Sequence, residues 1–241
     1  DEWTLHRLSN EDILELAKNI DNVKNNIAKV CLHCNRQNDV ILVGASKTMS
    51  QEVIDAVSNN NLLKVLGENR VQELIQKYHE GQNFDWHFIG KLQSNKVKYI
   101  IDKVKLIHSV DSISLAKEID KQAKKHNLVM PVLLQINMGK EESKSGFFIE
   151  EIENSISEIS KFENITIKGL MAVMPICEES KTIELYKSLK IKFLECKEKY
   201  NFEYLSAGMT NDYLLAIEYA GANIVRVGTA IFGKRSYDEK S

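Results

Sequence analysis

Proline, cysteine and long hydrophobic runs are scarce in this chain, and each scarcity excludes something. With two prolines and eleven glycines among 241 residues, the chain has no room for a low-complexity linker. No apolar run approaches the ~18 residues that a membrane span needs. The first ten residues lack the basic and apolar regions of a signal peptide. We therefore expect a cytoplasmic protein with no membrane partner.

Two of the four cysteines, Cys31 and Cys34, have the C-x-x-C spacing of redox and zinc motifs. A zinc site would need two more ligands at a matching spacing, which Cys177 and Cys196 do not provide. A redox motif should follow a strand and open a helix, whereas this one ends a helical stretch. We predict reduced thiols and no metal site.

The chain also lacks a large excess of either positive or negative residues. The 32 basic and 34 acidic residues are mixed along the chain and leave a net charge of −2. The absence of a basic stripe argues against nucleic acid as a partner. The apolar fraction of 43% is sufficient for a real core.

The chain does contain a regular alternation of apolar strands and amphipathic helices. Apolar residues recur every three or four positions over 10–35, which predicts a long first helix, begun by Ser9 and an acidic first turn. The expected strands are 41–48, 62–66, 85–89, 106–110, 132–136, 166–174, 204–206 and 223–227. The helices expected between them are 51–57, 70–77, 95–101 with Ser94 as its cap, 113–125, 149–159, 181–199, 212–220 and a short one from 229.

Eight strand–helix repeats suit βαβ units with right-handed crossovers, which wind into a doubly wound sheet or a closed barrel. Eight repeats without an obvious break favour the barrel. We predict an α/β protein, a single (β/α)8 TIM-type barrel with an extra N-terminal helix. The one domain would span residues 1–241, with the helix at about 10–35 and the barrel at about 39–235.

The first expected strand ends in a lysine. Alternation places Lys47 on the same side as Ile41, Val43 and Ala45. A lysine that is desolvated has a lowered pKa, and its amine becomes a usable nucleophile for Schiff-base chemistry. The alternative is a strand-end lysine that turns into water, as most lysines do.

Two loops at the other end of the chain suit a phosphate. In (β/α)8 barrels phosphate is often held by the loops after strands 7 and 8, at the C-terminal face. Each stretch alone is an ordinary helix cap, but both together predict a phosphate site, because helix starts favour an anion. The stretches concerned are 205–212, with small and hydroxyl-bearing residues that lead into a helix, and 225–233, with Gly228 and Thr229.

Arg226 lies between two valines of the last strand, on the side of Ile224. It could meet an anion or a ring nitrogen at the barrel mouth, or pair with a carboxylate of a neighbouring strand. A lysine after strand 1 and a phosphate cradle after strands 7 and 8 describe a site for pyridoxal 5′-phosphate (PLP).

Other candidates have simpler readings. Lys144, in the loop after strand 5, is a second possible aldehyde-reactive amine or phosphate contact, and more simply a solvated loop lysine. We predict that His87 is a satisfied structural histidine, and that Met171 and Met174 fill the core near the rim. The lysine-rich stretch 187–199 is expected to be a solvated helix face.

Eight segments carry a family likeness: GASKT (44–48), GENRVQE (67–73), WHFIGKLQSNK (86–96), HSVDS (108–112), QINMGKEESKSG (135–146), KGLMAVMP (168–175), LSAGMTND (205–212) and VRVGTAIFGKR (225–235). They resemble the YggS/PROSC family of PLP homeostasis proteins, which is itself similar to the barrel domain of bacterial alanine racemase. The likeness covers roughly residues 40–235 in the right order, and WHFIGKLQSNK with VRVGTAIFG is highly specific.

The resemblance implies a role for each site residue. Many members have a proline shortly after the lysine, where this chain has Met49 and Ser50, so the course of the first loop departs from the pattern. By the resemblance, Lys47 is the Schiff-base lysine, Ser206, Gly208, Thr210, Gly228 and Thr229 hold the phosphate, Arg226 lies at the pyridine nitrogen and Asn69 lies near the ring.

The resemblance also implies a monomeric, non-catalytic PLP carrier for intracellular PLP homeostasis, with apo forms of PLP-dependent enzymes as recipients. Racemases similar to this barrel bring a tyrosine from a second, β-rich domain of a partner subunit, and we expect no such domain here. A PLP-dependent amino-acid racemase and a phosphate-ligand barrel without a Schiff base are the alternatives.

Overall fold

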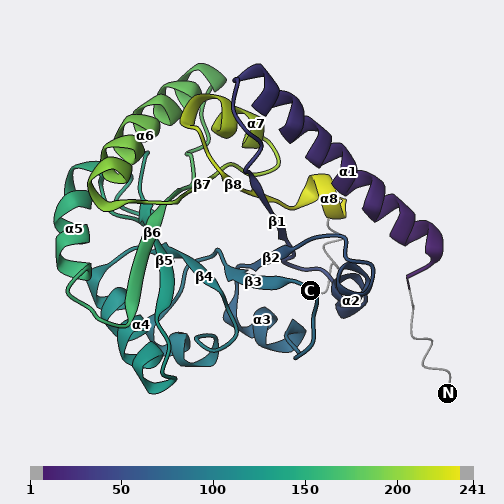
Figure 1. Ribbon diagram of the computed structural model, residues 1–241, viewed down its shortest axis with the longest axis horizontal. Coiled ribbons are helices and arrows are strands. Elements are labelled where there is room, and N and C mark those ends of the chain that lie inside the picture. Colours follow the sequence, from purple (N-terminus) through teal and green to yellow (C-terminus); the bar gives the residue numbers. More distant parts are fainter. Residues whose placement is uncertain (1–7, 234–241) are drawn as a thin grey trace.

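Eight parallel strands close into a barrel in chain order in the computed structural model, which describes residues 8–233 (Figure 1). The predicted (β/α)8 barrel with an N-terminal helix is confirmed, whereas the predicted domain limits, 1–241 and 39–235, extend outside the described residues. The strands are β1 Ile41–Ala45, β2 Val65–Glu68, β3 Asp85–Phe88, β4 Leu106–Val110, β5 Met130–Ile136, β6 Ile165–Ala172, β7 Tyr204–Ala207 and β8 Ile224–Val227.

Helices surround the barrel, and serine side chains begin several of them. Ser9, Ser50 and Ser112 each accept a backbone N–H from the first turn of the helix that follows. No helix within residues 8–233 is long and apolar enough to cross a membrane. The helices are α1 Asn10–His33, α2 Gln51–Asn59, α3 Val71–Lys77, the 3₁₀ segment η1 Ser94–Tyr99, α4 Ile113–Lys125, the 3₁₀ turn η2 Ile149–Glu151, α5 Ile152–Ile159, α6 Glu179–Tyr200, α7 Tyr213–Leu215, the π-helical η3 Ala216–Ala220 and α8 Thr229–Phe232.

Three local expectations are corrected. Ser94 lies inside η1, and the residue that caps this segment is Gln93. The first strand ends at Ala45, so Lys47 lies in the turn that follows and not in the strand. The second strand begins at Val65 and not at residue 62, because the preceding apolar pair packs in the core outside the strand and thereby extends the apolar run.

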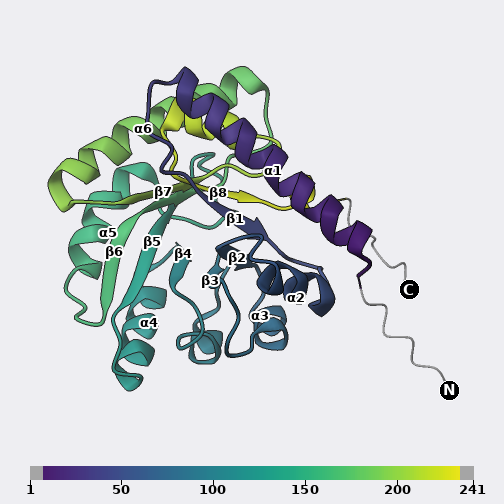
Figure 2. The ribbon, with the colours of Figure 1, turned by 45° about the vertical axis from the view of Figure 1, so that its right-hand side comes forward.

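Helix α1 lies across the outside of the barrel where the last helix is short (Figures 1 and 2). Asn19 Nδ2 donates to Ile231 O of α8 at 3.1 Å, and Asn26 Nδ2 donates to the Tyr213 hydroxyl of α7 at 3.2 Å. The helix buries Leu16, Ile20, Val23, Ile27 and Cys31 on one face. Because α8 has only four residues, α1 supplies the cover that β8 and β1 need.

The barrel interior holds an apolar cluster and a group of buried polar side chains. By strand register, Val43 of the apolar cluster lies opposite Arg226, and Met171 lies opposite Ser206. The polar group consists of His87, His108, Ser206 and Arg226. The apolar cluster consists of Val43, Val65, Leu106, Leu133, Met171 and Ile224.

At Gly169 the backbones of two adjacent strands approach each other closely. A Cβ at this position would lie 1.7 Å from Tyr204 O of the adjacent strand β7. We expect Gly169→Ala to lower the free energy of unfolding by about 3 kcal/mol or more, because the backbone has to move to admit the methyl group. Urea denaturation measures this loss, and unchanged stability would contradict the strand spacing seen here.

Candidate functional site

The C-terminal ends of the strands gather most of the predicted site residues on one rim. Lys47 lies two residues after β1, and Asn69 directly follows β2. Strand β1 pairs with β8, with Gly44 opposite Val227. Lys47 and Thr229 therefore follow adjacent strands at the same end of the barrel.

Hydrogen bonds join the loop after β7 to β8 and to α8. The backbone N–H of Arg226 in β8 donates to Gly208 O at 2.9 Å, and the backbone N–H of Ala230 in α8 donates to Thr210 Oγ1 at 3.4 Å. Gly208 has φ +99°, and a Cβ there would lie 2.7 Å from Tyr213 Cα, so only glycine fits. Thr229 is exposed and Thr210 is half-buried, which leaves hydroxyl groups at the rim.

Asp212 holds the loop after β7 in place through two hydrogen bonds. Its Oδ1 accepts the Met209 N–H at 2.8 Å, and its Oδ2 accepts the hydroxyl of the buried Tyr186 from α6. Burial raises the pKa of Tyr186, and the negative charge of Asp212 raises it further. The phenol consequently remains a hydrogen-bond donor and holds the carboxylate in place.

A chain of four buried side chains runs beneath the rim. Arg226 Nη1 donates to Ser206 Oγ at 2.5 Å, Ser206 Oγ lies 2.8 Å from His108 Nδ1, and His108 Nε2 lies 2.9 Å from His87 Nδ1. Arg226 Nη2 also donates to Ala172 O at 2.9 Å. Arg226 thus faces the barrel interior, on the side of Ile224 as predicted, and hydrogen-bonds a hydroxyl and a carbonyl.

The ionisable side chains of this hydrogen-bonded series differ in charge. Burial lowers the pKa of Arg226 to about 10, while Tyr186 and Asp212 oppose that shift, so the guanidinium is charged at neutral pH. Burial lowers the pKa of His87 to about 4. Burial, the neighbouring His87 and the Arg226 charge all lower the pKa of His108. Both imidazoles are therefore neutral at pH 7.

The Ser206 hydroxyl already has two partners inside the barrel. Ser206 is fully buried, one layer beneath the exposed Thr229. The predicted phosphate residues thus separate into two levels. Thr210, Thr229 and the two glycines lie in the rim loops, whereas Ser206 connects Arg226 to His108.

The turn that carries Lys47 is supported by a charged cluster that the sequence did not reveal. The cluster consists of Glu68 at the end of β2, and of Glu73 and Lys77 of α3. Lys77 Nζ lies 3.0 Å from Glu68 Oε2 and 2.9 Å from Glu73 Oε2. Ser46 Oγ donates to the same Glu68 oxygen at 2.9 Å.

The pKa values of the two carboxylates in this cluster shift in opposite directions. Burial raises the pKa of Glu68, although the ammonium of Lys77 opposes the shift. Burial also acts to raise the pKa of Glu73, but hydrogen bonds from Lys77 and the Thr48 N–H outweigh it and lower that pKa. Glu73 is therefore the carboxylate that most firmly keeps its charge.

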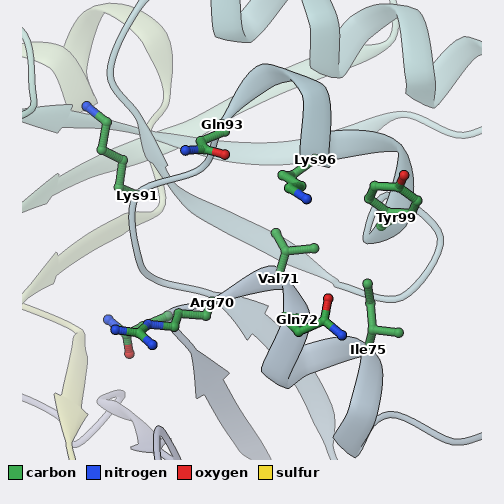
Figure 3. A pocket seen from close by; sticks show the side chains of 9 residues that line it. Arg70, Val71, Gln72, Ile75, Lys91, Gln93, Lys96 and Tyr99 are labelled. Atoms are coloured by element: carbon green, nitrogen blue, oxygen red, sulfur yellow. The ribbon is translucent and has the colours of Figure 1, made fainter.

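A hollow of about 570 Å³ adjoins the rim beside Asn69 (Figure 3). Val71, Gln72 and Ile75 of α3 line one side of it, and Figure 3 shows Gln93, Lys96 and Tyr99 opposite them. Arg70 and Lys91 complete the lining with two positive charges, and Lys91 Nζ reaches Ser145 Oγ at 3.0 Å. Of the predicted site residues, Asn69 lines this hollow.

The structure also places the other candidate side chains. Lys144 is exposed in the loop after β5, as the simpler interpretation expects, Met171 is buried in the apolar cluster of the barrel, and Met174 is half-buried against the core. His87 is satisfied by its contact with His108. Cys31, Cys34, Cys177 and Cys196 are free thiols. No group of metal-binding side chains occurs among residues 8–233.

The residues of the rim fit PLP in kind. Lys47 supplies an amine, the rim loops supply the Thr210 and Thr229 hydroxyls beside glycine backbone, and Arg226 supplies a fixed positive charge below them. An amine beside hydroxyl groups and glycine backbone suits a ligand that carries an aldehyde and a phosphate. The fold and rim thus define the class: a (β/α)8 barrel built to hold a small phosphorylated ligand.

Comparisons with known proteins identify the family within this class. A family model described as "Alanine racemase, N-terminal domain" matches residues 19–236. The pyridoxal phosphate homeostasis protein of Aquifex aeolicus is 42% identical over 230 residues, which cover 93% of this chain and all of that protein. The chain therefore belongs to the YggS/PROSC family of pyridoxal phosphate homeostasis proteins.

Solved structures agree with this assignment. PipY of Synechococcus elongatus PCC7942, solved with PLP bound, superposes with a TM-score of 0.78 at 28% identity and covers 90% of this chain and 100% of its own. Alanine racemase of Clostridium difficile 630 superposes with a TM-score of 0.72 at 18% identity, which shows the fold alone. The match covers 92% of this chain and 61% of the racemase.

Proposed function

We propose that this chain binds PLP through a Schiff base to Lys47 and holds it for delivery to apo-enzymes. The observation that carries the proposal is the pairing of β1 with β8, which brings the turn with Lys47 beside the loop with Gly228 and Thr229. The PLP bound to PipY and the name of the Aquifex relative support it. The predicted cytoplasmic, monomeric state belongs to the same proposal.

Bound PLP supplies an aldehyde and a ring that withdraws electrons. Lys47 would hold the cofactor through a C=N bond from its Nζ to the aldehyde carbon, and the carbonyl oxygen would leave as water with the two protons of the neutral amine. Thr210, Thr229 and the backbone beside Gly208 and Gly228 are proposed to bind the phosphate. Asn69 is proposed to lie near the ring.

Arg226 is proposed to face the ring nitrogen. Its guanidinium is held by Ser206 Oγ and Ala172 O, and it is charged at neutral pH because burial lowers its pKa only to about 10. A fixed positive charge there disfavours protonation of the nitrogen and so weakens electron withdrawal by the ring. This suits holding the cofactor better than carbanion chemistry such as decarboxylation, although it does not exclude racemisation.

The test begins with the purified chain incubated with PLP and dialysed. We expect visible absorbance, and after borohydride reduction and digestion a phosphopyridoxyl group on Lys47. Loaded protein mixed with a PLP-dependent apo-enzyme should restore that enzyme's activity. The control is loaded protein that has been reduced, because its C–N single bond cannot hydrolyse and should release nothing.

Two results would decide for other functions. Exchange of the α-proton of D- or L-alanine with D₂O above the background of free PLP would establish the racemase and overturn the carrier. A chain that retains inorganic phosphate but no PLP would establish the phosphate-ligand barrel.

A further inference from the structure

The peptide groups on both sides of Lys47 are held by two side chains of α3. Lys77 Nζ donates to Ser46 O, just before Lys47, at 2.8 Å. Glu73 Oε2 accepts the N–H of Thr48, just after Lys47, at 2.9 Å. The same Glu73 oxygen lies 2.9 Å from Lys77 Nζ, so the two contacts are joined behind the turn.

The side chains behind the turn are charged in a place where apolar packing is usual. The Lys77 side chain is 8% exposed and that of Glu68 is 0% exposed. Replacing a buried ion pair by apolar residues of similar size is often neutral or stabilising. A need for stability therefore does not account for the cluster, whereas its contacts with the backbone of the turn do.

Thr48 adds an independent sign of constraint. It adopts φ +67°, in the left-handed region, where a β-branched residue is strained. Such strain persists only where the surroundings impose it, and it is concentrated at functional sites. The hydrogen bond from the Thr48 N–H to Glu73 restrains this residue, together with the turn hydrogen bond from the Met49 N–H to Ser46 O at 3.0 Å.

We infer that Glu73 and Lys77 are positioning residues, which fix the turn of Ser46 and Thr48 so that the Lys47 amine is presented to an aldehyde at the rim. Both act through the backbone of the turn and through each other. The inference rests on the proposed function of Lys47. If the cluster only stabilised the fold, its loss would instead weaken the binding of every ligand at the rim equally.

Two ligands separate these roles. Pyridoxine 5′-phosphate has the ring and phosphate of PLP but an alcohol in place of the aldehyde, so it forms no bond with Lys47. The quantity measured is the preference for PLP, defined as the dissociation constant of pyridoxine 5′-phosphate divided by that of PLP. An inactive fraction of protein lowers the binding capacity for both ligands and leaves this ratio unchanged.

We expect Glu73→Ala to lower the preference for PLP at least tenfold, because a misplaced nucleophile loses the advantage of orientation. Glu73→Gln should keep most of the preference, since one amide oxygen can accept both N–H groups. Glu203→Ala is the matched control. Its carboxylate pairs with Lys168 at 3.1 Å at the other end of the barrel, and the preference should not change.

A second variant guards against a failure of Glu73→Ala to fold. Glu68→Gln combined with Lys77→Met removes one charge of each sign and releases Ser46 O, and it should lower the preference in the same way. The inference is overturned if the folded variants keep the preference of the wild type, whether or not their affinity for both ligands falls. A wild-type chain without any preference for PLP overturns the proposed function of Lys47 instead.

Discussion

Replacing Lys47 by methionine should abolish the covalent retention of PLP and weaken its binding by about two orders of magnitude, or ~3 kcal/mol. The rim loops after β7 and β8 would still bind the phosphate, but no C=N bond could form. Methionine has a similar length and no amine, so the turn should remain folded. Absorbance titration measures the loss of affinity, and borohydride reduction followed by mass spectrometry measures the loss of the covalent adduct.

Lys144→Met is the matched control for this prediction. Lys144 is exposed in the loop after β5, and its loss should leave PLP binding unchanged. Lys77 should escape labelling as well, because its ammonium is already directed at Ser46 O, Glu68 and Glu73. A reduced adduct on Lys144, or wild-type retention in Lys47→Met, would show that another amine is the tether.

The carrier hypothesis also gives the fixed positive charge of Arg226 a role. Arg226 is fixed from below by Ser206 and by a carbonyl of β6, with two neutral histidines behind it. If Arg226 faces the ring nitrogen as proposed, its charge limits the ring as an electron sink, and bound PLP would promote carbanion reactions only weakly. Exchange of the α-proton of amino acids, measured on PLP-loaded protein, tests this effect of Arg226 directly.

The order of the elements could be predicted from the sequence because apolar runs and helical spacing recur with little interruption. The ranges 106–110 and 113–125 agree with β4 and α4 to the residue. The second strand was placed too early, since Leu62 and Leu63 extend the apolar run although they pack outside β2. Its true end, Glu68, is a buried charge that no apolar pattern includes.

The site was predictable where residues lie at the ends of strands, and hidden where partners come from distant segments. His108 and Ser206 are 98 positions apart, and nothing local indicates that they touch. Glu73 and Lys77 are four apart on a helix, the spacing of an ordinary surface pair. Lys77 is buried only because the barrel places Glu68 and Ser46 against it. The signal available was an acidic residue, Glu68, two positions after the end of a predicted buried strand.

Acid should destabilise this protein already as the pH falls below 6.5, because burial keeps two histidines neutral in the folded chain. The unfolded pKa of histidine is 6.5, and burial lowers that of folded His87 to about 4. The unfolded chain therefore binds more protons between these values, and stability is fully present above pH 6.5 and lost as the pH falls. At 1.36 kcal/mol per unit, His87 alone removes about 2 kcal/mol by pH 5 and about 3 kcal/mol by pH 4. His108, whose pKa burial, His87 and Arg226 also lower, adds to the loss.

Urea denaturation at several pH values between 7 and 5 isolates the two buried histidines. Glu68, whose pKa burial raises, and the exposed His79, whose pKa its hydrogen bonds to Glu80 and Asp55 raise, act in the opposite sense, so the observed loss is a net value. The double variant His87→Gln/His108→Gln keeps amide hydrogen bonds without a titrating ring and should remove most of the slope. His126→Gln, at the exposed end of α4, should leave the slope unchanged. Equal slopes in the wild type and the double variant would mean that the acid loss arises elsewhere, whereas their separation would show that protonation beneath Arg226 opposes folding.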